Sequence, residues 1–318
     1  DISEKRKAQD GRMTVTVDRQ EYDIRISSIP TVHGEKIVMR LSSKLSLTRE
    51  KKQLGLSEEE LAHFDHMMSS PYGIIFVTGP TGSGKSTTLY TALSELNKEA
   101  VNIVTVEDPV EADIDGINQI QVNPKVDLTF ASALRSILRQ DPDIIMIGEI
   151  RDQETASIAV QASITGHLVV STMHTNNAVG TLNRIADMGI ERYLVADSMI
   201  GVIAQRLVRK LCPHCRKKRL ATVEEKRLLR VAPEAETEVY EPVGCNFCNH
   251  TGYFGRIGVF EIMEVNEEIR TLISTNAGTE ELIAAAKRNG MRTLRENGIR
   301  YVLDGTTSMD EMLKASYE

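Results

Sequence analysis

The chain contains no tryptophan, and aromatic residues make up only 4% of its 318 residues. Proteins that hold single-stranded nucleic acid stack its bases on aromatic side chains, so this scarcity disfavours such a surface. The formal net charge of −7 also disfavours a polyanion-binding protein, although local basic clusters remain open. A run of about 18 apolar residues is missing too, and the sequence therefore predicts no membrane-spanning helix.

The first residues, DISEKRKAQDGR, include neither an initiating methionine nor the apolar core of a secretion signal. We interpret the chain as a fragment whose upstream part is absent. Its charged (26%) and hydrophobic (41%) fractions are typical of soluble globular proteins, and its length is enough for two or three compact units.

No cysteine is left over from two Cys-x-x-Cys pairs, Cys212 with Cys215 and Cys245 with Cys248, which are separated by 29 residues. A disulfide scaffold is disfavoured in a long chain without a secretion signal. Two such pairs predict a closed, structural, four-thiolate Zn²⁺ site and a reducing compartment. The basic run 216–219 between the pairs is interpreted as a solvated loop, and a docking patch for a membrane-embedded partner stays open.

The hydrophobic periodicity changes along the chain. Alternation over 12–41 predicts a small sheet-rich unit, and Ser57 with Glu60 predicts a capping-box helix start. From Gly73, the strands GIIFVTG, NIVTVED, DIIMIGEI and HLVVSTMH alternate with helices expected near 129–140, 152–164, 177–187 and 192–205. This order predicts an α/β fold with a mostly parallel sheet covered on both faces. The expected units are 1–49, 50–205, 206–262 and a helical region, 263–318.

A phosphate-binding loop follows the first of these strands and opens a helix. The segment Gly79-Pro80-Thr81-Gly82-Ser83-Gly84-Lys85-Ser86-Thr87 fits GxxxxGK[ST] in the required strand–loop–helix context. Glycines let successive N–H groups point into one concavity, and the helix N-terminus adds partial positive charge. Lys85 is expected to reach the β- and γ-phosphates of ATP, and the Ser86 hydroxyl to ligate Mg²⁺.

Acidic residues and histidines end the neighbouring strands. Glu107 and Glu149 each follow a buried strand, and the carboxyl ends of parallel strands meet at one edge, so both should converge near the γ-phosphate. Asp108, before Pro109, is equally explained by turn chemistry. His174 and Thr175 follow the next strand at the position of a γ-phosphate sensor, while His167, which precedes that strand, could simply cap it.

Six ordered segments together resemble the secretion ATPase superfamily, in particular its type II secretion and type IV pilus assembly ATPases. The segments are GPTGSGKSTTLY (79–90), TVEDPVE (105–111), LRQDPDIIMIGEIRD (138–152), TGHLVVSTMHTN (165–176), AQRLVRKLC (204–212) and GYFGRIGVFE (252–261). The resemblance covers nearly the whole chain. It implies a RecA-like P-loop ATPase core, a small N-terminal sheet-rich α+β lobe, a tetracysteine zinc insert and a helical C-terminal segment.

The resemblance also implies roles for single residues. Glu107, His167 and His174 inherit positions near the γ-phosphate, and Glu149 stands where the family has its atypical Gly–Glu Walker B motif. Arginines of the N-terminal lobe are expected to contact that phosphate, which points to Arg25 and Arg40 and, more weakly, to Arg12. From the residues alone, a solvated strand face is the preferred interpretation of these arginines.

The implied protein is a homo-hexameric motor that hydrolyses ATP to ADP with Mg²⁺ and carries Zn²⁺. Its implied partners are inner-membrane platform proteins, reached partly through the missing upstream region, and its implied place is the cytoplasmic face of the bacterial inner membrane. Nucleic acid is not an expected partner. Two alternatives stay open: a RecA-like nucleic-acid translocase with a zinc ribbon, and a nucleotide-gated scaffold that has lost hydrolysis, which Gly148 motivates.

Overall fold

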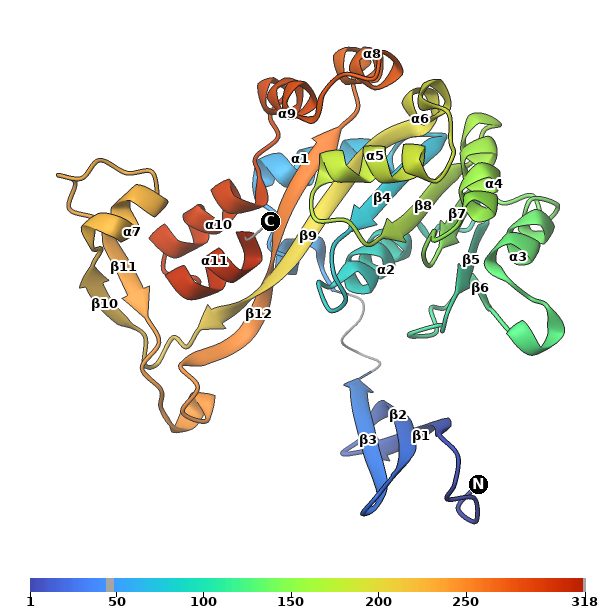
Figure 1. The fold of residues 1–318 in the computed structure, drawn as a ribbon, viewed down its shortest axis with the longest axis horizontal. Helices are drawn as coiled ribbons and strands as arrows, with labels where there is room; N and C mark the ends of the chain where they lie inside the picture. Colours follow the sequence, from blue (N-terminus) through green and yellow to red (C-terminus); the bar gives the residue numbers. More distant parts are fainter. Residues whose placement is uncertain (44–48, 317–318) are drawn as a thin grey trace.

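The computed structural model describes residues 1–43 and 49–316. A large α/β body carries most of the chain, and a small N-terminal sheet lies beside it (Figure 1). The strands of the large body form a seven-stranded sheet in the order β12-β9-β4-β8-β7-β5-β6. Their bounds are Gly73–Thr78 (β4), Ile103–Glu107 (β5), Asn118–Gln121 (β6), Ile144–Ile147 (β7), Leu168–Met173 (β8), Met199–Leu211 (β9) and Tyr253–Glu264 (β12).

The predicted α/β class is confirmed, because β4, β5, β6, β7, β8 and β9 pair in parallel and only β12 runs antiparallel to its neighbour. The four central strands β4, β5, β7 and β8 are buried along their whole length, which explains why their sequences are continuous apolar runs rather than alternating ones. Since parallel strands need crossover connections, helices cover both faces of the sheet.

Each face of the sheet has its own apolar core. Ile75 and Val77 of β4 pack toward helices α1 (Glu58–Met68) and α2 (Lys85–Leu96). Ile74 and Phe76, the alternate residues of the same strand, pack toward the opposite group of helices. That group comprises α3 (Phe130–Ile137), α4 (Gln153–Ile164), α5 (Ala178–Asp187), α6 (Arg192–Ser198), α8 (Glu267–Ser274) and α9 (Thr279–Arg288). The predicted capping box is confirmed at the start of α1, where Ser57 and Glu60 bond reciprocally.

An insert separates β9 from β12 and packs on the last two helices. It contains β10 (Lys217–Leu220), α7 (Val223–Leu228) and β11 (Glu238–Glu241), and the helices are α10 (Leu294–Leu303) and α11 (Met309–Ser316). Leu229 and Val239 of the insert share a buried cluster with Val302 and Met312. The insert lies at one end of the molecule in Figure 1, with the cysteine turns below it.

The N-terminal sheet consists of β1 (Gln9–Val17), β2 (Gln20–Thr31) and β3 (Gly34–Ser43), paired antiparallel. Its register places Arg12 opposite Arg25 and Arg25 opposite Arg40, so the three arginines form a row across one face. Residues of the alternate set, including Met13, Met39 and Leu41, form the other face and are exposed.

The structure differs from the sequence prediction near residue 199. A helix was expected over 192–205, but α6 ends at Ser198 and β9 begins at Met199. Apolar residues on both sides of β9, such as Val202 and Ile203, are buried on both faces of the sheet, a pattern that resembles a buried helix in sequence. Consequently β9 and β12 cross the expected boundaries after 205 and 262, and the insert lies between Leu211 and Tyr253.

Candidate nucleotide-binding site

The loop between β4 and α2 is built around left-handed glycines. Gly82 and Gly84 have φ values of 80° and 91°, and Gly79 has 146°, conformations that residues with a Cβ rarely adopt. Lys85 begins α2 and is buried, and its Nζ donates hydrogen bonds to Gly79 O (2.8 Å) and Pro80 O (3.1 Å). Burial lowers the pKa of Lys85 below its ordinary value; the Glu149 carboxylate opposes this shift and the Arg206 guanidinium adds to it.

Gln205 braces this loop, a role that the sequence reasoning did not assign. Its buried side chain donates to Ser83 O (2.9 Å) and accepts a hydrogen bond from Thr88 Oγ1 (2.8 Å). A Cβ at Gly79 would lie 2.4 Å from the Gln205 carbonyl oxygen, so the loop crosses β9 at a distance that only glycine permits. In the sequence, a single glutamine within a mainly apolar segment was the feature that could have indicated this role.

Glu107 ends β5 as a buried carboxylate whose oxygens are held by neighbours. Oε1 accepts hydrogen bonds from Thr105 Oγ1 (2.6 Å) and Gln119 Nε2 (3.0 Å), and Oε2 accepts one from the Tyr90 hydroxyl. Burial, together with the adjacent carboxylate, raises the pKa of Tyr90, so its hydroxyl remains a donor. The loop helix α2, which carries Tyr90, is therefore tied to the end of β5.

Glu149 follows β7, and its two carboxylate oxygens differ in their contacts. Oε1 pairs with the exposed Arg151, whereas Oε2 is buried without a hydrogen-bond partner among the described residues. The His174 Nε2 atom lies 3.7 Å from Oε2. A buried carboxylate oxygen without a donor carries an unmet desolvation cost, which a water or a hydrated cation would relieve.

The neighbouring Gly148 has a steric explanation. A Cβ at this position would lie 3.3 Å from both Glu107 Cα and Val106 O, and the Gly148 N–H donates to Val106 O at 2.7 Å. The end of β7 thus approaches β5 so closely that a side chain such as aspartate would need a small shift of the two strands. The glycine lets the backbone carry Glu149 alongside Glu107.

A cavity of about 720 Å³ joins most of the predicted residues. Its walls include Lys85, Glu107, Glu149 and His174, and also Arg40 from the N-terminal sheet. The loop residues that line it are Thr81, Gly82, Ser83, Gly84, Lys85, Ser86 and Thr87. The open loop amides, the Ser86 hydroxyl and the unpartnered Glu149 oxygen fit a nucleoside triphosphate with a magnesium ion at Ser86.

Two of the predicted histidine and threonine positions lie outside this cavity. His167 precedes β8, beside Gly73 at the start of β4, so it lies at the sheet edge opposite the loop, and its Nδ1 is 3.0 Å from Ala162 O. Thr175 Oγ1 is 2.6 Å from Thr181 Oγ1. Within one chain, the structure therefore does not bring His167 to the phosphate loop, because the length of β8 separates them.

The row of arginines faces the loop that follows β5. Arg25 pairs with Glu111, and Arg12 pairs with the buried Asp23 (2.6 Å) and donates to Val110 O (3.3 Å). Like charges directly opposite each other on a sheet repel, and these carboxylates offset that cost. All three arginines line an adjoining cavity, and Arg40 lines the nucleotide cavity as well.

The four cysteines form a candidate metal centre at the base of the insert. Their Sγ atoms all lie within 4.8 Å of one another, with Cys212–Cys245 at 3.9 Å and both Cys215–Cys248 and Cys245–Cys248 at 3.8 Å. A tetrahedral ion with Zn–S bonds of about 2.3 Å requires separations of about 3.8 Å. Although desolvation opposes ionisation, the N–H groups of Cys245 and Gly252 lower the pKa of Cys248 to about 6. The set fits Zn²⁺ with no coordination position left open.

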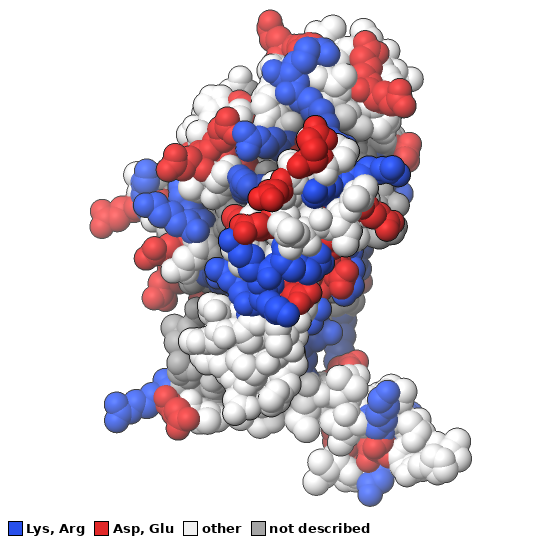
Figure 2. All heavy atoms as spheres, turned by 90° about the vertical axis from the view of Figure 1, so that its left-hand side faces the viewer, with Lys and Arg blue, Asp and Glu red and all other residues white. Residues whose placement is uncertain are grey.

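The surface around the cysteines is largely uncharged. Figure 2 shows this end of the molecule, with a broad area free of charged side chains below a belt of Lys and Arg. His214, Phe247 and Phe254 stack there with ring centroids 4.3 and 4.5 Å apart. Of the basic run, Lys218 and Arg219 form ion pairs with Glu238 and Glu225, and Arg216 donates to Gly305 O (2.6 Å), so these charges hold the insert together.

Together, the glycine loop, the parallel sheet and the two strand-end carboxylates define a P-loop nucleotide-binding protein. A family model described as "Type II/IV secretion system protein" matches residues 1–314, and the chain belongs to that family. Over 316 residues it is 52% identical to the type II secretion system protein HxcR of Pseudomonas aeruginosa, covering 99% of this chain and 64% of the relative. It is 49% identical to the type II secretion system ATPase E of Vibrio cholerae, covering 100% and 63%.

The type IV pilus assembly ATPase TfpB of Acinetobacter baylyi is 46% identical, with 98% of this chain and 54% of the relative covered. The chain thus spans less than two thirds of the length of these relatives. Among solved structures, the pilus retraction motor PilT with bound ADP aligns with a TM-score of 0.71 and 28% identity, covering 98% of this chain and 78% of that one. The ATPase DotB of Legionella pneumophila shares the fold at 22% identity and a TM-score of 0.70.

Proposed function

We propose that this chain is the ATP-hydrolysing core of a motor for type II secretion or type IV pilus assembly. The observation that carries the proposal is the single cavity that joins Lys85, Glu107 and the unpartnered Glu149 oxygen. Relatives named as a secretion ATPase and as a pilus assembly ATPase, and a neighbour with bound ADP, support the same reading.

In the proposed reaction, Lys85 turns from the carbonyls of Gly79 and Pro80 to the β- and γ-phosphates. Glu149 orients the attacking water through its open oxygen and accepts its proton, while Glu107 fixes the neighbouring strand end. Ser86 would hold Mg²⁺, which supplies positive charge to the phosphates when bound. Arg40 and His174, which both line the cavity, stabilise charge on the departing phosphoryl group.

Loss of the γ-phosphate would then release the N-terminal sheet from the core. Arg40 has the geometry to sense the phosphate directly, and Arg25, paired with Glu111 beside it, to follow. We further propose that six copies form a ring in which this movement is passed to inner-membrane platform proteins. The motor would work on the cytoplasmic face of the inner membrane, and the Zn²⁺ at the cysteines would be structural. None of the described helices is long and apolar enough to cross a membrane.

Two substitutions test this proposal on the assembled oligomer. Lys85→Ala should abolish phosphate release, and Glu149→Gln should retain bound ATP while turnover falls by about a hundredfold or more, the usual loss for a missing general base. Glu154→Gln is the matched control, because Glu154 is exposed on α4, lies outside the nucleotide cavity and pairs with Arg135. Undiminished phosphate release in either test variant would contradict the assignment, and stimulation by DNA or RNA would favour the translocase alternative.

A further inference from the structure

A second cavity, of about 490 Å³, lies between the C-terminal helices, the insert and β9, and none of its lining residues is shared with the nucleotide cavity. Its volume is in the range of small-molecule sites. Its charge is unusual for a chain with a net charge of −7: of the described residues, the walls carry Arg206, Arg230, Lys287 and Arg295 but only one carboxylate, Glu261.

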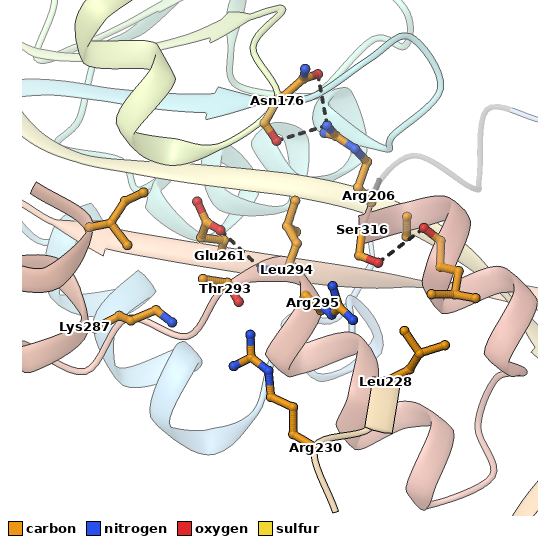
Figure 3. A pocket seen from close by; sticks show the side chains of 13 residues that line it. Asn176, Arg206, Leu228, Arg230, Glu261, Lys287, Thr293, Leu294, Arg295 and Ser316 are labelled. Atoms are coloured by element: carbon orange, nitrogen blue, oxygen red, sulfur yellow. Dashed lines mark hydrogen bonds between the residues drawn. The ribbon is translucent and has the colours of Figure 1, made fainter. Parts of the chain in front are cut away.

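Three of these cations converge although they come from different elements. Figure 3 shows the ends of Lys287 from α9, Arg295 from α10 and Arg230 from the loop after α7 pointing toward the same space. Three like charges brought together in a folded protein repel unless an anion joins them. Glu296, at the border, offsets part of this charge through Lys287 (2.8 Å) and Arg230 (3.3 Å).

The side chain of Arg295 has a buried hydrogen-bond donor without an acceptor. Its Nε is buried without a hydrogen-bond partner, and no ion pair of Arg295 occurs within residues 1–43 and 49–316. A buried guanidinium N–H without an acceptor costs free energy that a bound oxyanion would recover. The Glu261 oxygens accept the N–H groups of Ala178 (2.8 Å) and Leu294 (3.2 Å), and among the described residues neither oxygen is bonded to Arg295 Nε.

Part of the wall is apolar and is formed by Leu228, Ile283, Leu294 and Leu313, while Asn176, Thr293 and Ser316 add neutral polar groups. Guanidinium groups match the oxygens of a phosphate with two parallel donors, and the apolar wall suits a flat or aliphatic body. We propose that this cavity is a second ligand site, for a small phosphate monoester with an apolar body, held by Arg230, Lys287 and Arg295.

The site also adjoins the nucleotide loop. Arg206, at the far side of the cavity in Figure 3, donates to Asn176 O (3.0 Å) and to Gln205 O (3.2 Å), and Gln205 is the residue that braces the loop. An anion in the cavity therefore changes the electrostatic potential beside that loop without occupying it.

Phenyl phosphate is a suitable probe, since it combines a phosphate dianion with an apolar ring. In a titration of the methyl-labelled chain followed by NMR, the site predicts saturable shifts at Leu228, Ile283, Leu294 and Leu313. Arg230→Gln and Arg295→Gln should each weaken the apparent affinity about tenfold, as expected for one lost charge-assisted contact. Arg288→Gln is the control, because Arg288 lies on α9 but pairs with Glu268 outside the cavity.

The outcome separates this site from the nucleotide site. Lys85→Ala should leave the cavity shifts unchanged, so they stand even if the ATPase proposal fails. Shifts confined to Leu89 and Leu207, which line the nucleotide cavity, would overturn the second site. Cavity shifts that persist in both arginine variants, or that follow protein concentration rather than phenyl phosphate, would also overturn it, the latter in favour of an acidic segment of a second copy.

Discussion

At the scale of single residues, Gly148 sets the spacing between the strand ends that carry Glu107 and Glu149. Gly148→Ala would place a methyl group 3.3 Å from the backbone of β5, so we expect β5 and β7 to separate by a few tenths of an ångström and to shift Glu149. We expect a loss of about 1–3 kcal/mol in the free energy of unfolding, as for other overpacked sites, measured by urea denaturation. Turnover should fall at least about tenfold, because a catalytic group displaced by a fraction of an ångström loses its alignment.

Gly278→Ala provides the comparison for that experiment, because a Cβ at Gly278 meets no atom within 4 Å. It should leave turnover unchanged. Wild-type turnover in Gly148→Ala would show that the spacing of β5 and β7 does not set the position of Glu149.

At the scale of elements, the register of the N-terminal sheet presents Arg40 to the nucleotide. Arg40→Ala should raise the KM for ATP and lower kcat by about tenfold or more, because a charge-assisted contact to the departing phosphate is lost. Lys36→Ala, on the same strand but outside both arginine-lined cavities, should behave as the wild type in the same steady-state assay. Equal behaviour of the two variants would remove Arg40 from the site.

The cysteine insert is a second element with a separate prediction. Cys212→Ser should abolish zinc binding, measured as metal content per chain, and lower the unfolding temperature, since Cys212 is buried where β9 enters the insert. His214→Ala should keep about one zinc per chain, because its ring stacks on Phe247 and the four thiolates complete the coordination. Retention of zinc in Cys212→Ser would contradict the four-thiolate site.

The sequence predicted those elements that are marked by glycine positions, capping residues or a clear hydrophobic period. The strand–loop–helix around Lys85 follows from glycine positions and flanking periodicity, and the α1 start follows from Ser57 and Glu60. The path of β9 was not predictable, because β9 begins at Met199 directly after α6 ends at Ser198, and a strand buried on both faces has no period of two to mark that change. The contacts of Gln205, Tyr90 and Arg151 also escaped prediction, since they depend on which segments meet in space.

At the scale of the whole molecule, the N-terminal sheet and the large body meet, in the part of the chain that the structure describes, through polar and charged contacts rather than a shared apolar core. Arg12 and Arg25 bond to Val110 and Glu111 of the large body, while the apolar face of the small sheet is exposed. Charged contacts at a lobe boundary are sensitive to the charge of a bound nucleotide, whereas a packed apolar boundary would resist movement. This arrangement suits a protein whose lobes change position during a nucleotide cycle.

A structure of the oligomer with Mg²⁺ and a non-hydrolysable ATP analogue would test the central claim most directly. Our account predicts that the terminal phosphates lie on the amides of residues 82–86, with Ser86 on the metal. Glu149 Oε2 should hold a water in line with the γ-phosphate, and Arg40 and His174 should approach that phosphate from the cavity walls. A terminal phosphate bound away from Glu107 and Glu149, with Glu149 Oε2 still unpartnered, would contradict it.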